Sequence, residues 1–285
     1  MPGLRDIKRR IKSVKSTQQI TKAMKMVAAA KLKRAQEEIW AARPYARKMM
    51  EVLSSLAART RPEAHPLLMK REVRRVELLI ITSDRGLCGG FNSNIIRTSE
   101  DFIRRNKGRF DIYLNLIGRK ARDYFRRRGF ELRAERPNTL GRPSYSWASE
   151  IGQEIVDAYI KGVFDEVYLV YSEFITVFSQ RPTVVRLLPI VPLEMEGFPS
   201  GYIFEPSEDE ILSQLLPKHV DVQVFRALLE SSASEHGARM TAMDSATRNA
   251  SELIDALTLR FNRLRQAGIT KELMEIVGGA EALKG

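Results

Sequence analysis

Hydrophobic residues recur at steps of three or four along the first part of the chain. The stripe contains Leu4, Ile7, Ile11, Val14, Ile20, Met24, Val27, Leu32, Ala35, Ile39, Ala42, Ala46, Met49, Leu53 and Leu56. A narrow apolar stripe of this kind predicts a long helix with a coiled-coil seam. Pro44 is the only helix breaker in the series, and we expect it to bend the helix or to form a local joint.

The last part of the chain carries a second helical stripe. Residues 207–210 (SEDE) have the form of a capping box, with further carboxylates near the positive end of the helix dipole. Pro217 should interrupt the helix early, and no proline follows between 218 and 283. The stripe contains Phe225, Leu228, Leu229, Ser232, His236, Met240, Met243, Ala246, Ala250, Leu253, Leu257, Leu264, Leu273, Ile276 and Val277. A continuous helix over this stretch would be roughly 100 Å long.

The middle of the chain alternates between strand and helix patterns. Strands are expected near 76–82, 110–117, 130–133 and 166–171, with a further strand or hairpin over 176–188, and helices over 93–106, 119–128 and 144–161. This alternation predicts a small parallel, Rossmann-like α/β domain. One globular insert between two long helices returns the chain to its start, which favours an antiparallel coiled coil. The expected division is 1–72, 73–206 and 207–285.

Charge is distributed unevenly. Residues 1–75 carry 20 Lys and Arg against 6 Asp and Glu, whereas residues 207–285 carry 9 basic and 12 acidic residues. The basic first helix therefore suits a mildly acidic last helix, although exposed ion pairs contribute little individually. The single cysteine, Cys88, excludes an internal disulfide framework and favours a reducing compartment. No run of 18 apolar residues and no secretory signal pattern is present.

The glycine-rich turn over 83–92 is the one candidate for a nucleotide site. Its G-x-x-G-G spacing fits neither the dinucleotide fingerprint nor the P-loop, so we interpret it as a tight strand-to-helix connection that needs positive φ angles. His65, His219 and His236 stand apart from other potential ligands in the sequence. We therefore expect no catalytic residues, no metal site and no cofactor.

Three classes of function remain open on these patterns alone. A mechanical, rod-forming subunit is favoured. An enzyme that uses a nucleotide on the sheet would show tight, stoichiometric nucleotide binding. A basic coiled-coil protein that binds nucleic acid would retard duplex DNA at about 200 mM salt, where contacts made only to phosphates fade. No aromatic residue that could stack on a base occurs before Trp40, which weighs against the third class.

Four segments in the expected order resemble the gamma subunit of bacterial F-type ATP synthases. They are Ile20–Ala29 (ITKAMKMVAA), Ser83–Gly90 (SDRGLCGG), Ala238–Met243 (ARMTAM) and Ile269–Ala280 (ITKELMEIVGGA). The resemblance covers essentially the whole chain. It implies a non-catalytic, central-stalk rotor subunit, present once per complex, that transmits torque between an ion-driven c-ring and an alpha/beta catalytic hexamer. It also implies contacts with the epsilon subunit and a peripheral location on the cytoplasmic face of the bacterial cell membrane.

The resemblance further assigns contacts to individual residues. Catch contacts with the alpha and beta subunits would involve Met24, Lys25, Arg239, Gln266, Thr270 and Glu272. Contacts with the c-ring and epsilon would involve Tyr202, Phe204, Glu205 and Pro206. The apolar tip of the shaft would include Leu273, Ile276 and Val277. Gly268 departs from the family pattern and should soften the shaft locally by about 1 kcal/mol relative to alanine.

Overall fold

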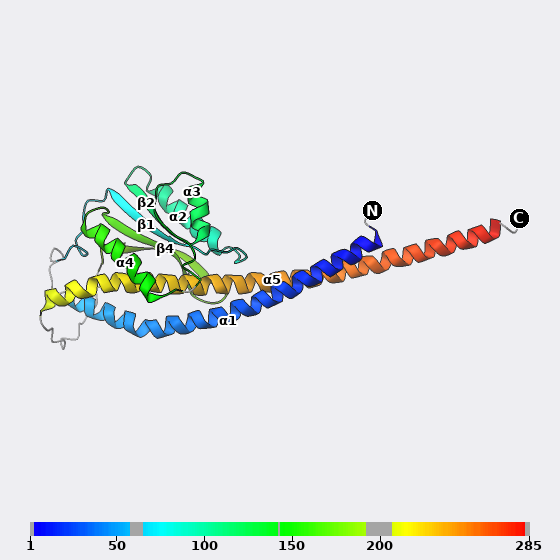
Figure 1. The fold of residues 1–285 in the computed structure, drawn as a ribbon, viewed down its shortest axis with the longest axis horizontal. Coiled ribbons are helices and arrows are strands. Elements are labelled where there is room, and N and C mark those ends of the chain that lie inside the picture. The colour runs from blue at the N-terminus through cyan, green and yellow to red at the C-terminus, as the bar shows by residue number, and fades with distance from the viewer. Residues whose placement is uncertain (1–2, 58–64, 142, 192–206, 283–285) are drawn as a thin grey trace. The chain divides into compact units, whose positions relative to one another are not determined.

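The computed structural model describes residues 3–57, 65–141, 143–191 and 207–282 of the 285-residue chain. Two very long helices enclose an α/β segment in the chain order (Figure 1). The elements are α1 (Leu4–Ala57), β1 (Arg75–Ile81), α2 (Phe91–Arg105), β2 (Asp111–Ile117), α3 (Arg119–Arg126), β3 (Leu132–Arg136), α4 (Tyr145–Ile160), β4 (Glu166–Phe174), β5 (Gln180–Leu188) and α5 (Glu208–Ala282).

The strands form one five-stranded sheet in the order β3-β2-β1-β4-β5. The β1–β2, β1–β4 and β2–β3 pairs are parallel, which confirms the predicted α/β domain. The β4–β5 pair is antiparallel, so the sheet is mixed rather than wholly parallel. An antiparallel edge strand is reached by a short turn and needs no crossover helix. β1 lies at the centre, and its six residues from Val76 to Ile81 are all buried.

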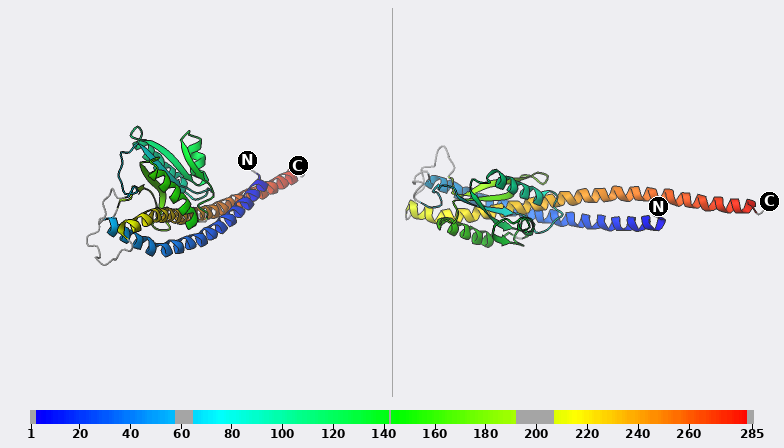
Figure 2. Two further views of the ribbon diagram at one scale, coloured as in Figure 1. Left: turned by 60° about the vertical axis from the view of Figure 1, so that its left-hand side comes forward. Right: turned by 90° about the horizontal axis from the view of Figure 1, so that it is seen from above.

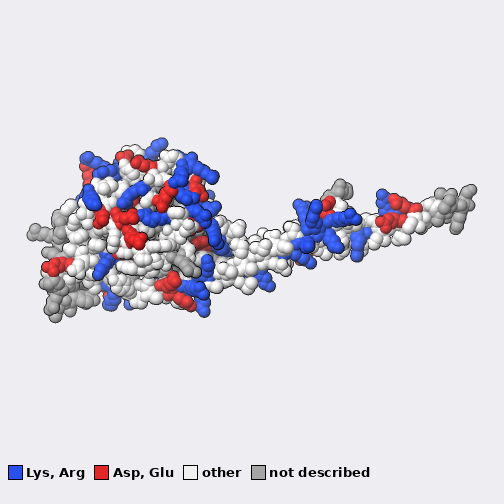
Figure 3. All heavy atoms as spheres, viewed as in Figure 1, with Lys and Arg blue, Asp and Glu red and all other residues white. Residues whose placement is uncertain are grey.

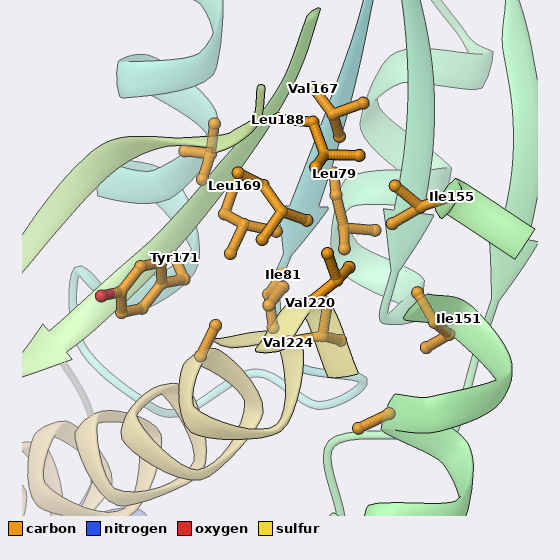
Figure 4. Close-up of a cluster of buried hydrophobic side chains, with 14 of the residues drawn as sticks. Leu79, Ile81, Ile151, Ile155, Val167, Leu169, Tyr171, Leu188, Val220 and Val224 are labelled. Carbon is orange, nitrogen blue, oxygen red and sulfur yellow. The ribbon is translucent and has the colours of Figure 1, made fainter. Parts of the chain in front are cut away.

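The core lies between the sheet and the helices that cover it. Figure 4 shows Leu79 and Ile81 of β1 pointing toward Ile155 of α4 and Val224 of α5. All four side chains are at most 2% exposed. The first half of α5 therefore replaces one of the helices that would cover this face in an ordinary doubly wound domain. Helices α2 and α3 pack against the sheet from the other side (Figure 1).

Both long helices are continuous through their prolines. Pro44 lies inside α1, and Pro217 lies inside α5, so the predicted interruption at Pro217 was wrong. A proline removes one helical hydrogen bond, and burial of neighbours such as Leu216 and Val220 on the core side can offset that loss. The predicted cap is present, because Ser207 Oγ accepts a hydrogen bond of 3.3 Å from Glu210 N.

Some positions of the predicted seam were wrong, because a neighbouring residue is buried in place of the predicted one. Ile20, Val27 and Leu253 are 48–59% exposed, whereas Thr21 and Ala28 are buried. Sequence reasoning favoured the larger apolar residue at each turn, but closely approaching helices leave room only for small side chains at some positions.

The described chain groups into two compact units. The first contains Met1–Val27 with Met240–Gly285, and the second contains Ala28–Arg239. We call the paired helical stretch of the first unit, residues 4–27 of α1 with 240–282 of α5, the stem. The second unit contains the sheet and its covering helices. The division into 1–72, 73–206 and 207–285 stays a prediction, because the two units group residues by packing and not by consecutive segments of the chain.

Candidate functional site: a filled sheet edge and a paired stem

The carboxyl edge of the sheet is filled by the chain itself. In open α/β sheets, ligands bind in the crevice where the strand order reverses, which here lies between β1 and β4. At that place Ser172 N donates a hydrogen bond of 3.4 Å to Ser231 Oγ, and Ser234 Oγ donates one of 3.0 Å to Ser172 O. Ser231 and Ser234 of α5 are completely buried. Helix α5 therefore occupies the position in which such sheets hold a nucleotide.

The turn that follows β1 is stabilised by its own hydrogen bonds. Asn92 Oδ1 accepts a bond of 2.9 Å from Ser83 N, and Ser83 Oγ donates one of 2.7 Å to Arg85 O. Positive φ angles occur at Gly89 (54°) and, without the help of a glycine, at Leu87 (64°). This geometry matches the tight strand-to-helix connection predicted from the sequence. Burial raises the pKa of the Cys88 thiol, which favours its protonated form.

Close packing at the end of β2 completes the closure of this edge. Gly118 has a φ of 91°, and a Cβ atom built there would lie 2.1 Å from Thr82 O. Asp84 Oδ1 accepts hydrogen bonds from Arg119 N (3.0 Å) and Asn138 N (2.8 Å), so one carboxylate joins the start of α3 to the loop after β3. The described loops at this edge are thus held together by specific hydrogen bonds.

Arg239 connects α5 to the turn after β1. Its Nη1 atom donates a hydrogen bond of 2.6 Å to Gly86 O, and its Nη2 atom pairs with the Glu235 carboxylate one helical turn earlier. Only 12% of the Arg239 side chain and 9% of the Glu235 side chain are exposed. Burial raises the pKa of Glu235, and the bond from Arg239 opposes that shift. Arg239, expected to contact other subunits, is bonded here within its own chain.

The stem is an antiparallel pair of helices. Thr247 Oγ1 donates a hydrogen bond of 2.8 Å to Thr21 Oγ1, and Lys25 Nζ lies 2.5 Å from Asp244 Oδ1. Ile7 and Leu257 line one small hollow between the two helices. Residues later in α1 thus pair with residues earlier in α5. Both views in Figure 2 show the two helices side by side in the stem. This arrangement confirms the predicted antiparallel pairing.

The Lys25–Asp244 contact gives one of the expected catch residues a partner inside the chain. The hydrogen bond from Lys25 lowers the pKa of Asp244, and Arg248 adds a second contact of 3.3 Å to the same carboxylate. Met24, next in the chain, is half-buried. Sequence reasoning did not single out Asp244. The available signal was that residues 7–36 contain ten basic residues and no acid, so any partner had to come from the other helix.

Beyond its pairing with α1, α5 continues as an exposed helix. Gln266, Thr270 and Glu272 are exposed, as is every described side chain from 271 to 279. The predicted tip residues Leu273, Ile276 and Val277 are 56%, 68% and 61% exposed. Large apolar side chains exposed in one stretch mark a surface that another molecule covers. On the face that Figure 3 shows, blue basic side chains gather along the stem, with red acidic side chains beside some of them.

Other expected features can be placed only in part. Tyr202, Phe204, Glu205 and Pro206 lie outside the described residues. Within the residues that the structure describes, no group of three or more His, Cys, Asp or Glu could hold a metal ion. No helix in the described ranges has both the length and the apolar character needed to cross a bilayer.

Comparison with known proteins gives a consistent picture. The family model described as ATP synthase matches residues 3–283. The ATP synthase gamma chain of Desulforamulus reducens is 54% identical over 286 residues, and that of Desulfitobacterium hafniense is 55% identical over 285 residues. Both alignments cover all of this chain and all of the relative.

Solved structures support the same fold. A chain from the central stalk and c-ring of the Tetrahymena thermophila mitochondrial ATP synthase is 26% identical, with a TM-score of 0.61 over 80% of this chain and 99% of that chain. A chain from the Euglena gracilis mitochondrial ATP synthase in rotational state 3 has a TM-score of 0.70 over 98% of this chain and 94% of that chain. The second is only 21% identical and therefore speaks to the fold alone.

Proposed function

Since the chain belongs to the ATP synthase gamma chain family, we propose that it is the rotor of the central stalk and carries torque between a c-ring and an alpha/beta catalytic hexamer. In this role the chain performs no chemistry. It changes the conformation of its neighbours by presenting different sides to them as it turns. The coupling ion is set elsewhere in the complex.

The observation that carries this proposal is the stem. Two helices paired through Thr21–Thr247 and Lys25–Asp244 resist bending and twisting better than one helix, because each contact must shift when the pair deforms. The two sides of the pair also differ in chemistry, since α1 is basic and α5 is mildly acidic. A stiff pair of helices can transmit rotation. Because its two sides differ in charge, the surrounding proteins contact a different surface at each angle.

The filled sheet edge supports the non-catalytic part of the proposal. A nucleotide enzyme built on this sheet needs an open crevice at the switch point, and α5 occupies it with Ser231 and Ser234. The sheet therefore serves as a base for the long helices rather than as a binding platform.

The exposed surfaces suggest which part of the chain each partner contacts. The apolar side chains of Leu273, Ile276 and Val277 can turn against an apolar sleeve without a directional bond having to break at each step. Lys25, Gln266, Thr270 and Glu272 are polar and exposed enough to form angle-dependent contacts with alpha and beta, and Met24 lies beside Lys25. By family resemblance, contacts with the c-ring and epsilon are assigned to Tyr202, Phe204, Glu205 and Pro206. These contacts would hold the protein on the cytoplasmic face of the bacterial membrane.

The test is reconstitution of the whole complex. The chain should co-purify with alpha and beta subunits as a single copy per complex. Replacing Met24 with Lys, which adds a charge to an already basic helix, should lower the ATP yield per translocated ion more than it lowers assembly. An unchanged yield in a fully assembled Met24→Lys complex would contradict the proposal.

A further inference from the structure

A hollow of about 1040 Å³ lies between α1 and α5 within the second unit, next to the start of α4. Its lining includes Trp40 and Tyr45 of α1, Tyr145 of α4, and Phe225 of α5. Cavities of roughly 300–1,000 Å³ with mostly apolar and aromatic walls are typical of sites for small organic ligands. The described turn after β1 and the filled sheet edge take no part in it.

The aromatic side chains in this hollow are unusually exposed. Trp40 is 62% exposed, Tyr45 57% and Tyr145 46%. Tyr145 and Phe225 meet edge to face, with ring centroids 5.8 Å apart, which leaves ring surface available toward the hollow. Exposed rings at the wall of a concave site favour an occupant that is itself flat and aromatic.

The charges around the hollow are predominantly positive. Arg43, Arg47, Lys218 and Arg226 line it, against the single acid Glu230. Arg226 is paired with Glu230 at 2.8 Å, and Arg47 lies 3.7 Å from Glu51. Arg43 and Lys218 form no described ion pair, so two cations on opposite helices remain available for an anionic group. Arginine in particular binds planar anions with two parallel hydrogen bonds.

Two hydrogen-bond acceptors in the wall also have no described donor. Glu230 is 5% exposed, and its Oε2 atom has no hydrogen-bond partner. Pro44 has no N–H group, so the carbonyl of Trp40 lacks its usual helical donor. The Glu230 acceptor is buried, so leaving it without a donor is costly, and an N–H or O–H group on an occupant would relieve that cost.

We propose that this hollow is a binding site for an aromatic organic anion, a planar ring system that carries a carboxylate, sulfonate or phosphate. Its ring lies against Trp40 and Tyr145, and its charged group lies between Arg43 and Lys218. The site is independent of torque transmission, because it uses neither the stem nor the exposed end of α5.

The probe is 8-anilinonaphthalene-1-sulfonate, which joins two aromatic rings, an N–H group and one negative charge. Binding to the full-length chain is measured by probe fluorescence and by energy transfer from tryptophan. One site per chain is expected. Trp40→Ala and the double variant Arg43→Ala with Lys218→Ala should each raise the Kd about tenfold. Phe178→Ala, which removes an 83% exposed ring elsewhere, should leave the Kd unchanged.

A neutral probe, N-phenyl-1-naphthylamine, separates charge recognition from general apolar binding. Its affinity should fall in Trp40→Ala and stay unchanged in the Arg43 and Lys218 double variant. Equal losses of both probes in the double variant, or no loss of the sulfonate probe in either variant, would overturn the proposal. Displacement of the bound sulfonate by decanoate but not by 2-naphthoate would overturn the preference for a ring.

The last arm uses the assembled complex. The anionic probe should bind there with the same stoichiometry and the same sensitivity to Trp40→Ala. Loss of the site on assembly would mean that another subunit covers the hollow, and the assignment to a small ligand would then be wrong. Because this readout is binding and not ATP yield, its failure is distinguishable from failure of the rotor proposal.

Discussion

Lys25 Nζ of α1 lies 2.5 Å from Asp244 Oδ1 of α5, and this pair joins the two helices of the stem at one defined height. The two side chains are 44% and 36% exposed. Exposed pairs of this kind add little to stability because water and salt screen them. The value of the pair therefore lies in fixing register and surface charge rather than in holding the fold together.

Reversing one charge should disturb coupling more than folding. Asp244→Lys places three cations together, with Lys25 and Arg248, yet the Tm should fall by less than about 3 °C. ATP yield per ion in the reconstituted complex should fall clearly. The double variant with Lys25→Asp should recover most of the yield. A swap that restores neither yield nor register, as judged by cross-linking across the stem, would show that the pair does not act as a unit.

Arg239→Ala should destabilise the second unit strongly. The change removes the hydrogen bond to Gly86 O and leaves the buried Glu235 carboxylate without its cation, at a cost of about 3 kcal/mol. The pKa of Glu235 is already raised by burial and should rise further, so the cost grows as pH increases from 5 to 7 and the carboxylate ionises. Urea unfolding at both pH values measures this.

Arg239→Lys serves as the matched control, because it keeps the charge and loses the two-pronged geometry. Adding Glu235→Gln to Arg239→Ala should recover part of the lost stability by removing the unpaired charge. A pH-independent loss in Arg239→Ala would argue against the role given to Glu235.

Two buried histidines should make the protein sensitive to acid. Burial lowers the pKa of His219 to about 4, and burial together with the nearby positive charges of Lys31 and Arg239 lowers the pKa of His236 to about 4. The unfolded chain, with histidine pKa values near 6.5, binds more protons between about pH 4 and 6.5. Stability from these groups is therefore complete above that window and is lost as pH falls through it.

Each histidine should contribute a slope of about 1 kcal/mol per pH unit in this window. The buried acids Glu77 and Glu235 have raised pKa values and act in the opposite direction, so single variants are more informative than the total curve. His219→Asn and His236→Asn should each flatten the dependence of the urea midpoint between pH 6.5 and 4.5. Parallel curves for variant and parent would contradict this.

Gly268→Ala should stiffen the exposed part of α5. A Cβ atom at Gly268 meets no atom within 4 Å, so the change gains helix propensity of about 1 kcal/mol without a clash. Hydrogen exchange of amides between 264 and 274 should slow about fivefold. Gly278→Ala, also free of contacts but nearer the helix end, should have a smaller effect. Equal effects at the two positions would mean that helix fraying, not local propensity, limits protection.

Local patterns were sufficient to predict most of the secondary structure. Helices α2, α3 and α4 and the strands β1, β2 and β4 lie within a few residues of their predicted bounds, because period and turn residues are encoded locally. The cap at Ser207 is local in the same sense. The antiparallel direction of β5 and the continuity of α5 through Pro217 depend on packing with distant segments, and the sequence pattern does not contain that information.

Only the general location of the partners of the stem could be predicted from the sequence, because the first helix has an unusual excess of basic residues. The absence of acids in 7–36 implied a partner on another segment, but the identity of Asp244 depends on helix register. Sequence reasoning also did not foresee that α5 fills the crevice between β1 and β4. Ser231 and Ser234 look like exposed polar residues of a helix in the sequence, and only the folded structure places them against Ser172.

Ser231 and Ser234 have a consequence for control of the protein. Two buried serines of the same chain fill the crevice between β1 and β4, so this place in the described structure leaves no room for a metabolite. A ligand that acts on this unit would have to bind it at another surface, away from the strand ends. Other α/β proteins form the contacts in this crevice when a ligand binds. This chain forms them with its own helix α5, once, when it folds.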